Sequence, residues 1–148
     1  MSLSQKIKQV REAIVSKIQE IKSDLGDPNF IDIPPDERGF AMLPVIFVSQ
    51  SSATNRRLTT ETSIWLVSFF IDYYYSDIAR EDRREQAWGA GATIIEHLQT
   101  DPTLGGLTLG LDGDQFSIED TTIDFGAPDR FLHGIRISAT YILKPQEV

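Results

Sequence analysis

Apolar residues recur every three or four positions through the first 25 residues, and mostly charged residues fill the positions between them. This spacing predicts one amphipathic helix of about six turns, ended by Gly26 and Pro28. The apolar stripe needs a partner surface, most simply a sheet of the same chain. Its members are Leu3, Ile7, Val10, Ile14, Ile18, Ile21 and Leu25.

The segment after this helix changes character twice. Residues 27–42 hold prolines and acids and predict an irregular connection, while residues 43–49, LPVIFVS, predict a short strand. Residues 50–57, QSSATNRR, are polar and predict an exposed loop. Exposed loops often carry contacts, and this one holds an arginine pair without neighbouring acids. The candidate partner-binding residues are therefore Gln50, Ser51, Asn55, Arg56 and Arg57.

Residues 58–75 are the most β-prone segment of the chain. Alternation places Trp65, Val67, Phe69, Ile71 and Tyr73 on one face. The other face mixes Thr60, Thr62, Ser68 and Asp72 with Ile64, Leu66, Phe70 and Tyr74. A strand that is apolar on both faces is covered on both sides. We expect the helices to cover one face, and a neighbouring subunit or a second sheet to cover the other.

A second helix is predicted next, capped by Ser76 or Asp77 and ended at Thr100 because Pro102 disfavours helical geometry at the residue before it. Its inward face comprises Ala87, Gly91, Ile94, Ile95 and Leu98. Three strands follow at residues 107–111, 115–125 and 131–143, the last with clean alternation. The sequence LDGD between the first two predicts a tight hairpin turn.

The order of elements is helix, strand, long strand, helix and three strands. It predicts an α+β fold, with a mostly antiparallel sheet and two helices packed on one face. A chain of 148 residues fits a single domain, residues 1–148. With 41% hydrophobic and 24% charged residues, the chain has the composition of an ordinary folded protein.

The bulk composition narrows the function. The chain has no cysteine, which excludes disulfides, thiolate metal sites and cysteine nucleophiles. Its net charge of -8 argues against a protein whose main task is to grip nucleic acid. Its longest apolar run, residues 64–71, is far short of a membrane helix, and no signal peptide is visible. We expect a soluble protein that is made in the cytoplasm and does not associate with a membrane.

Candidate chemistry is sparse. His97 and His133 are the only possible histidine acid–base groups, and without a nucleophile motif both are better interpreted as ordinary polar residues. The acids of residues 112–124 do not follow calcium-loop spacing and favour surface turns. The glycines at 105, 106 and 110 match no phosphate-binding motif. We therefore expect no enzyme activity, no metal and no cofactor.

The aromatic cluster of the long strand allows two interpretations. Its side chains could line a ligand pocket or stack on bases, but a core and subunit-interface role fits a single long strand better. Its members are Trp65, Phe69, Phe70, Tyr73, Tyr74 and Tyr75.

Taken together with the order of elements, several segments resemble a known family. An amphipathic helix, LPVIFV, a long strand leading through YYSD to a helix, LQTDPTLGGLTLGL and HGIRISATYIL are similar to the tail terminator, or tail completion, proteins of long-tailed bacteriophages. The resemblance covers most of residues 3–143. The turn in the fourth segment fits this scheme: Pro102 ends the helix, Leu104 and Leu107 anchor the turn in the core, and the glycines permit a tight reversal into a strand.

The resemblance implies a structural virion protein of the phage tail or neck. Six copies would form a ring that caps the tail tube, ends its polymerisation and joins it to the head connector or stopper protein. DNA would pass through the lumen without specific binding. Two alternatives stay open: another neck or tail component such as a head-tail stopper, or a small ligand-binding domain or enzyme. The last would be a monomer with a deep polar pocket around His97 or His133.

Overall fold

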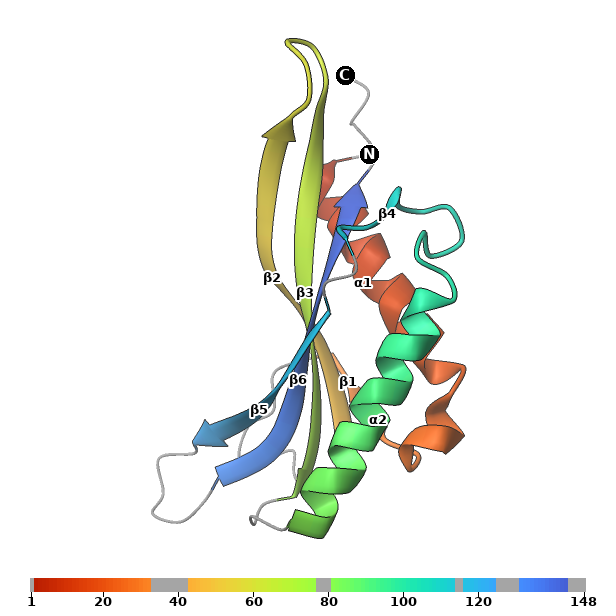
Figure 1. The fold of residues 1–148 in the computed structure, drawn as a ribbon, viewed down its shortest axis with the longest axis vertical. Coiled ribbons are helices and arrows are strands. Elements are labelled where there is room, and N and C mark those ends of the chain that lie inside the picture. The colour runs from red at the N-terminus through yellow and green to blue at the C-terminus, as the bar shows by residue number, and fades with distance from the viewer. Residues whose placement is uncertain (1, 33–42, 77–80, 114–115, 125–130, 144–148) are drawn as a thin grey trace.

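The computed structural model describes residues 2–32, 43–76, 81–113, 116–124 and 131–143. As the sequence predicts, the fold is α+β, with two helices on one face of a six-stranded, mostly antiparallel sheet (Figure 1). The elements are α1 (Leu3–Gln19), a 3₁₀ helix (Lys22–Leu25), β1 (Asn29–Ile31), β2 (Val45–Arg57), β3 (Ser63–Ser76), α2 (Glu81–Gln99), β4 (Gly110–Leu111), β5 (Ser117–Asp124) and β6 (Phe131–Leu143). The sheet order is β1-β2-β3-β6, and β4 and β5 both pair with the outer side of β6.

Helix α1 begins with a capping box, in which Ser2 and Gln5 exchange side-chain-to-backbone hydrogen bonds. Its predicted apolar stripe is confirmed, because Val10, Ile14 and Ile18 are fully buried against the sheet. The chain then leaves the helix through the 3₁₀ turn, and Gly26 adopts the left-handed backbone that ends it.

Helix α2 lies close to the sheet through small side chains. Its buried residues are Ala87, Ala90, Gly91, Ile94 and Leu98, so the predicted inward face is confirmed except that Ile95 is only partly buried. At Gly91 a Cβ would meet the Cδ1 atoms of Ile118 and Ile135 at 2.5 Å, which shows how closely the helix approaches β5 and β6. Ser76 is the last residue of β3, and the predicted cap at the start of the helix involves residues 77–80, which lie outside the described residues.

The prediction of a loop at residues 50–57 is wrong, because these residues form a strand. The prediction that they are exposed is confirmed. These residues continue β2, which pairs with β3 as far as Arg57↔Ser63, with a bulge between Gln50 and Ser52. The turn comes later, where the Leu58 N–H donates to the Thr62 carbonyl at 2.9 Å. The polar sequence reflects an edge strand whose side chains meet solvent, a setting in which apolar alternation is not needed.

The predicted hairpin at LDGD is also wrong. β4 and β5 do not pair with each other but follow one another along the same side of β6, from Gly110↔Ile142 to Asp124↔Phe131. Gly113, with φ 65°, lies in the break between them. A glycine with positive φ occurs in bulges as well as in hairpin turns, so the residue types of this segment do not distinguish a bulge from a hairpin.

The strand predicted at residues 107–111 is two residues long in the structure, Gly110–Leu111, because the chain forms a turn between α2 and β4. As expected, Leu104 is buried, Leu107 is partly buried, and Gly105 and Gly106 have φ of 71° and 88°. The Asp101 carboxylate accepts a hydrogen bond from the Gly105 N–H at 3.1 Å, which fixes the turn. A short parallel strand, β1, was missed within the predicted irregular connection, of which residues 33–42 lie outside the described residues.

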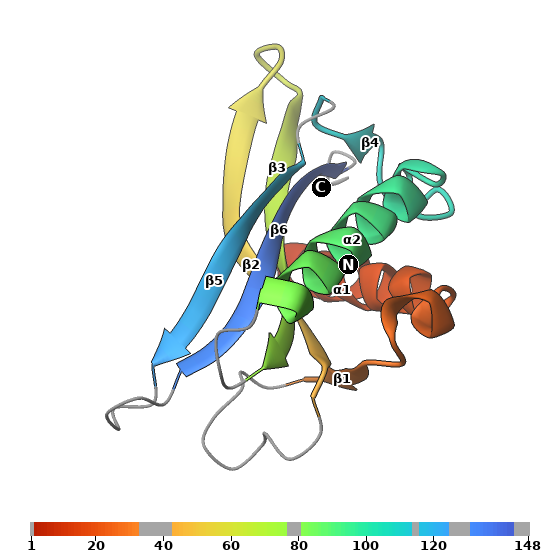
Figure 2. The same ribbon diagram turned by 60° about the horizontal axis from the view of Figure 1, so that its bottom comes forward.

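Both faces of β3 are apolar as predicted, but a second copy is not needed to cover the far face. The helix-facing Val67, Phe69 and Ile71 are fully buried. On the open face, which carries no helix, Ile64 and Leu66 are 8% exposed and Tyr74 is 1% exposed in a single chain. Figure 2 shows both helices on one side of the sheet. A neighbouring subunit or a second sheet is therefore not required to bury most of this face, and whether a neighbouring subunit packs on it stays a prediction.

The close pairing of β6 with β3 at Gly134 yields a stability prediction. A Cβ there would press on the Tyr73 carbonyl oxygen and meet Tyr74 Cδ1 at 2.7 Å, and the first of these is backbone that cannot swing aside. We expect Gly134→Ala to lower the free energy of unfolding by about 3 kcal/mol in urea titrations. Gly89→Ala is the matched control, because nothing lies within 4 Å of its Cβ, and it should stabilise the helix by about 0.5–1 kcal/mol. Equal stabilities for the two variants would contradict the packing at Gly134.

Candidate functional site

We call the outer part of the β2–β3 hairpin, residues 50–66 including the turn at its tip, the arm. Residues 56–64 of the arm extend beyond Leu143, the last described residue of β6 (Figures 1 and 2). Among the residues that the structure describes, β1 pairs with residues 45–47 of β2, and β6 pairs with β3 as far as Trp65. Within the described residues, the outer edge of β2 in the arm therefore has no strand beside it.

The structure brings the five predicted partner-binding residues onto this one strand. Gln50, Ser51, Asn55, Arg56 and Arg57 are all exposed. Asn55 is also used within the hairpin, since its Nδ2 donates to Ser63 Oγ at 3.3 Å. Arg56 and Arg57 lie on opposite faces of the arm because they are consecutive strand residues. At the tip, Leu58 is 56% exposed, so an apolar side chain stands in solvent directly after the two arginines.

One side chain of α1 marks where the free edge begins. Arg11 Nε donates to the Val48 carbonyl at 2.6 Å, immediately beyond the last β1 partner, Phe47. Its guanidinium also lies 4.0 Å from Asp32. Arg11 therefore takes the place that the next residue of a longer β1 would occupy.

A polar network on the open face was missed by the sequence analysis. Asp72, only 2% exposed, accepts hydrogen bonds from Arg136 Nε at 2.8 Å and Nη2 at 3.0 Å, and from the Tyr74 hydroxyl at 3.0 Å. The guanidinium carbon of Arg136 lies 4.1 Å from the centre of the Phe70 ring. Burial, with the nearby Asp72 carboxylate, raises the pKa of Tyr74, and the hydrogen bonds that Arg136 donates to Asp72 raise the pKa of Arg136. Every member is satisfied inside one chain, which points to a structural role.

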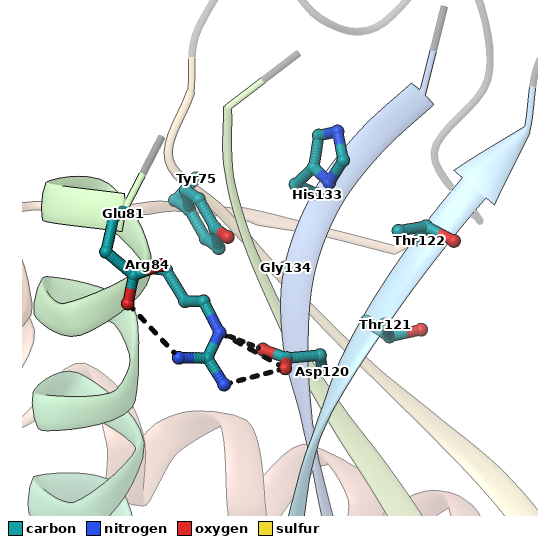
Figure 3. Close-up of a pocket in the computed structure, with 8 residues that line it drawn as sticks. All are labelled: Tyr75, Glu81, Arg84, Asp120, Thr121, Thr122, His133 and Gly134. Carbon is teal, nitrogen blue, oxygen red and sulfur yellow. Dashed lines mark hydrogen bonds and ion pairs between the residues drawn. The ribbon is translucent and has the colours of Figure 1, made fainter. Parts of the chain in front are cut away.

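A polar hollow of about 480 Å³ opens between the start of α2 and strands β5 and β6 (Figure 3). It is lined by Tyr75, Glu81, Arg84, Asp120, Thr121, Thr122, His133 and Gly134. Arg84 Nε and Nη2 bind the Asp120 carboxylate at 3.0 and 2.9 Å, and the Trp88 indole N–H donates to the same carboxylate at 2.9 Å. The clamp joins α2 to the edge strand β5, and its donors hold the pKa of Asp120 below its usual range.

The two histidines lie in different places. His133 lines the hollow, whereas His97 lies near the far end of α2, about 20 Å along the helix from Arg84, with Nε2 3.4 Å from Glu20. No group of three or more His, Asp or Glu residues that could hold a metal ion occurs among the described residues. The residues that line the hollow include a histidine and threonines, types that suit a small polar ligand, but its arginine is already engaged by two acids.

Comparisons with known proteins give no relative on which to base an assignment: no protein-family model matches the chain, and no curated protein sequence matches it significantly. Within the described part of the chain, no helix combines the length and apolar character needed to cross a bilayer.

The clamp between Arg84 and Asp120 beside the hollow yields a testable prediction about the pKa of Asp120. Because Arg84 is the main cause of the lowered Asp120 pKa, Arg84→Gln should return that pKa toward the ordinary value of about 3.9, as followed by carbon NMR of the side-chain carboxyl. The stabilisation is present above about pH 4 and is lost as pH falls through the lowered pKa. Solvent screens this pair, because the side chains of Arg84 and Asp120 are 40% and 50% exposed, so its contribution to stability is small. Arg83→Gln is the control, and an unchanged Asp120 pKa in Arg84→Gln would contradict the clamp.

Proposed function

We propose that this chain is the tail terminator subunit of a long-tailed bacteriophage. In this proposal six copies close into a ring on the finished tail tube, stop its growth and present a surface to the head connector. The chain acts as a structural protein of the virion neck, without catalysis, and DNA passes through the ring. The segments LPVIFV, LQTDPTLGGLTLGL and HGIRISATYIL carry the resemblance from which this proposal starts.

The observation that carries the proposal furthest is the arm. A subunit that docks onto a tube end and onto its own neighbours needs contact surface outside its own core. The arm supplies such surface, with a free strand edge, the exposed pair Arg56 and Arg57, and the exposed Leu58 at its tip. A second exposed leucine, Leu109, is 51% exposed in the turn before β4.

The structure changes how such a ring would be held together. The open face of β3 is hidden within one chain over most of its length, so the contacts of this proposal are polar and edge-based, in place of the shared apolar face that the sequence suggested. The same geometry suits another neck component, such as a head-tail stopper. A stopper would bind filled heads and leave tube growth unaffected.

A second candidate function rests on the hollow beside His133. Its volume of about 480 Å³ falls within the range of sites for small molecules, about 300–1,000 Å³, and most of the residues that line it are of polar types. A ligand-binding protein of this kind would work as a single copy. Measurement of the mass in solution therefore separates the two candidates.

Mass photometry of the purified chain tests the ring. We expect a species of six copies, about 100 kDa from subunits of 16.6 kDa, at micromolar concentration or when tail tubes are added. When the chain is added to polymerising tube subunits of its own phage, it should shorten the tubes and bind at their ends. Only a 16.6 kDa species, with no binding to tubes, would reject the proposal.

Reversal of the arm charges tests the contact surface. Arg56→Glu combined with Arg57→Glu should leave the circular dichroism spectrum and thermal midpoint unchanged, because both side chains are exposed, and should weaken incorporation into tails about tenfold or more. Lys8→Glu combined with Lys22→Glu changes the net charge equally at other exposed positions and is the control. Equal incorporation of both double variants would rule out the arm as the docking surface.

A further inference from the structure

Two free strand edges lie at opposite sides of the sheet. One is the outer edge of β2 beyond Val48, in the arm, and the other is the outer edge of β5. Among the described residues neither edge has a strand beside it. Unpaired edges of this length are templates for pairing with another chain. We propose that the β2 edge of one copy pairs with the β5 edge of the next, so that the sheet continues from copy to copy; this inference rests on the proposed ring.

Strand direction favours this junction. β2, β3, β6 and β5 alternate in direction because each neighbouring pair is antiparallel. β5 therefore runs opposite to β2 across the sheet. When a second copy is placed beside the first in the same orientation, its β5 meets β2 in antiparallel pairing, and the alternation continues without a break.

The charges on the two edges favour pairing of a β2 edge with a β5 edge over pairing of two like edges. β2 carries Arg56 and Arg57 and no acid, whereas β5 carries Glu119, Asp120 and Asp124 and no basic residue. Pairing β5 with β5 would bring acids together, and the basic β2 edge is attracted to the acidic one. Asp120 is already clamped by Arg84 and Trp88, while Glu119 is exposed. Like charges on each edge thus oppose a two-fold dimer and favour a head-to-tail contact.

The positions of the free edges also fit a closed assembly. Ser49, Phe70, Ser138 and Ser117 form one row across the sheet. From this row the free edge of β2 extends toward the arm tip, and β5 extends toward the opposite end. Each junction therefore shifts one copy along the strand direction relative to its neighbour. A sheet that closes on itself needs a stagger of this kind, and a head-to-tail contact generates a ring when its rotation closes and an open filament when it does not.

Cysteine cross-linking tests the junction directly because the chain has no cysteine of its own. Thr54 and Glu119 are exposed, lie on opposite edges, and share the open face, since their rows contain Leu66 and Asp72 of β3. A chain carrying both Thr54→Cys and Glu119→Cys is treated with a flexible bis-maleimide that tolerates a shift of one or two residues in register. We expect a ladder of covalent multimers, with a yield about tenfold above that of Lys8→Cys with Glu119→Cys, the control pair.

The single variants distinguish the possible contacts. Neither Thr54→Cys alone nor Glu119→Cys alone should form dimers, because a head-to-tail junction places each residue against a different one. Dimers from Thr54→Cys alone would indicate pairing of two β2 edges and would overturn the inference. A ring-sized mass without a ladder from the double variant would overturn the junction and leave the proposed function standing. A single-copy mass under all conditions would reject both.

Discussion

The antiparallel pairing of β3 with β6 is the constraint on which the rest of the structure depends. It runs from Trp65↔Leu143 to Ser76↔His133 and places Val67, Phe69 and Ile71 beside Tyr141, Ala139 and Ile137 under the two helices. A slip of one residue would turn these buried side chains to the open face and would separate Asp72 from Arg136. The ion pair on one face and the apolar core on the other therefore specify the same register.

Because this register is fixed in the centre, the margins of the sheet are free to differ. On one side the chain adds β4 and β5 as two pieces of one edge. On the other side it adds the short parallel β1, beyond which no strand of the described part of the chain lies beside β2. The clamp between Arg84, Asp120 and Trp88 secures β5 to α2. Nothing comparable ties down the arm tip among the described residues, and Leu58 and Arg57 remain in solvent. The molecule thus has one secured edge and one projecting edge.

The fold could be predicted from the sequence wherever apolar periodicity reports burial. Both helices, the long strand and the last strand carry such a pattern, and their placement on one face of a mostly antiparallel sheet is confirmed. The outer half of β2 could not be predicted, because an exposed edge strand needs no apolar alternation and QSSATNRR resembles a loop. The LDGD segment failed for another reason: a glycine with positive φ fits a hairpin and a bulge equally, and only the pairing with β6 decides.

The candidate site could be predicted only in part. Arginines without neighbouring acids pointed to residues 50–57, whose exposure is confirmed, while their role as a contact surface stays a prediction. The Asp72–Arg136 pair and the Arg84–Asp120 clamp join residues 64 and 36 positions apart, and such pairs cannot be identified before the strand register is known. A charged residue inside an apolar run, as at Asp72, was the one available signal that a partner had to exist.

Arg11 gives the bare edge a fixed starting point. Its guanidinium donates a hydrogen bond to the Val48 carbonyl, so an incoming strand can pair with β2 only from residue 49 onward unless it displaces this side chain. The contact from α1 therefore sets the residue of β2 from which pairing with another strand can begin.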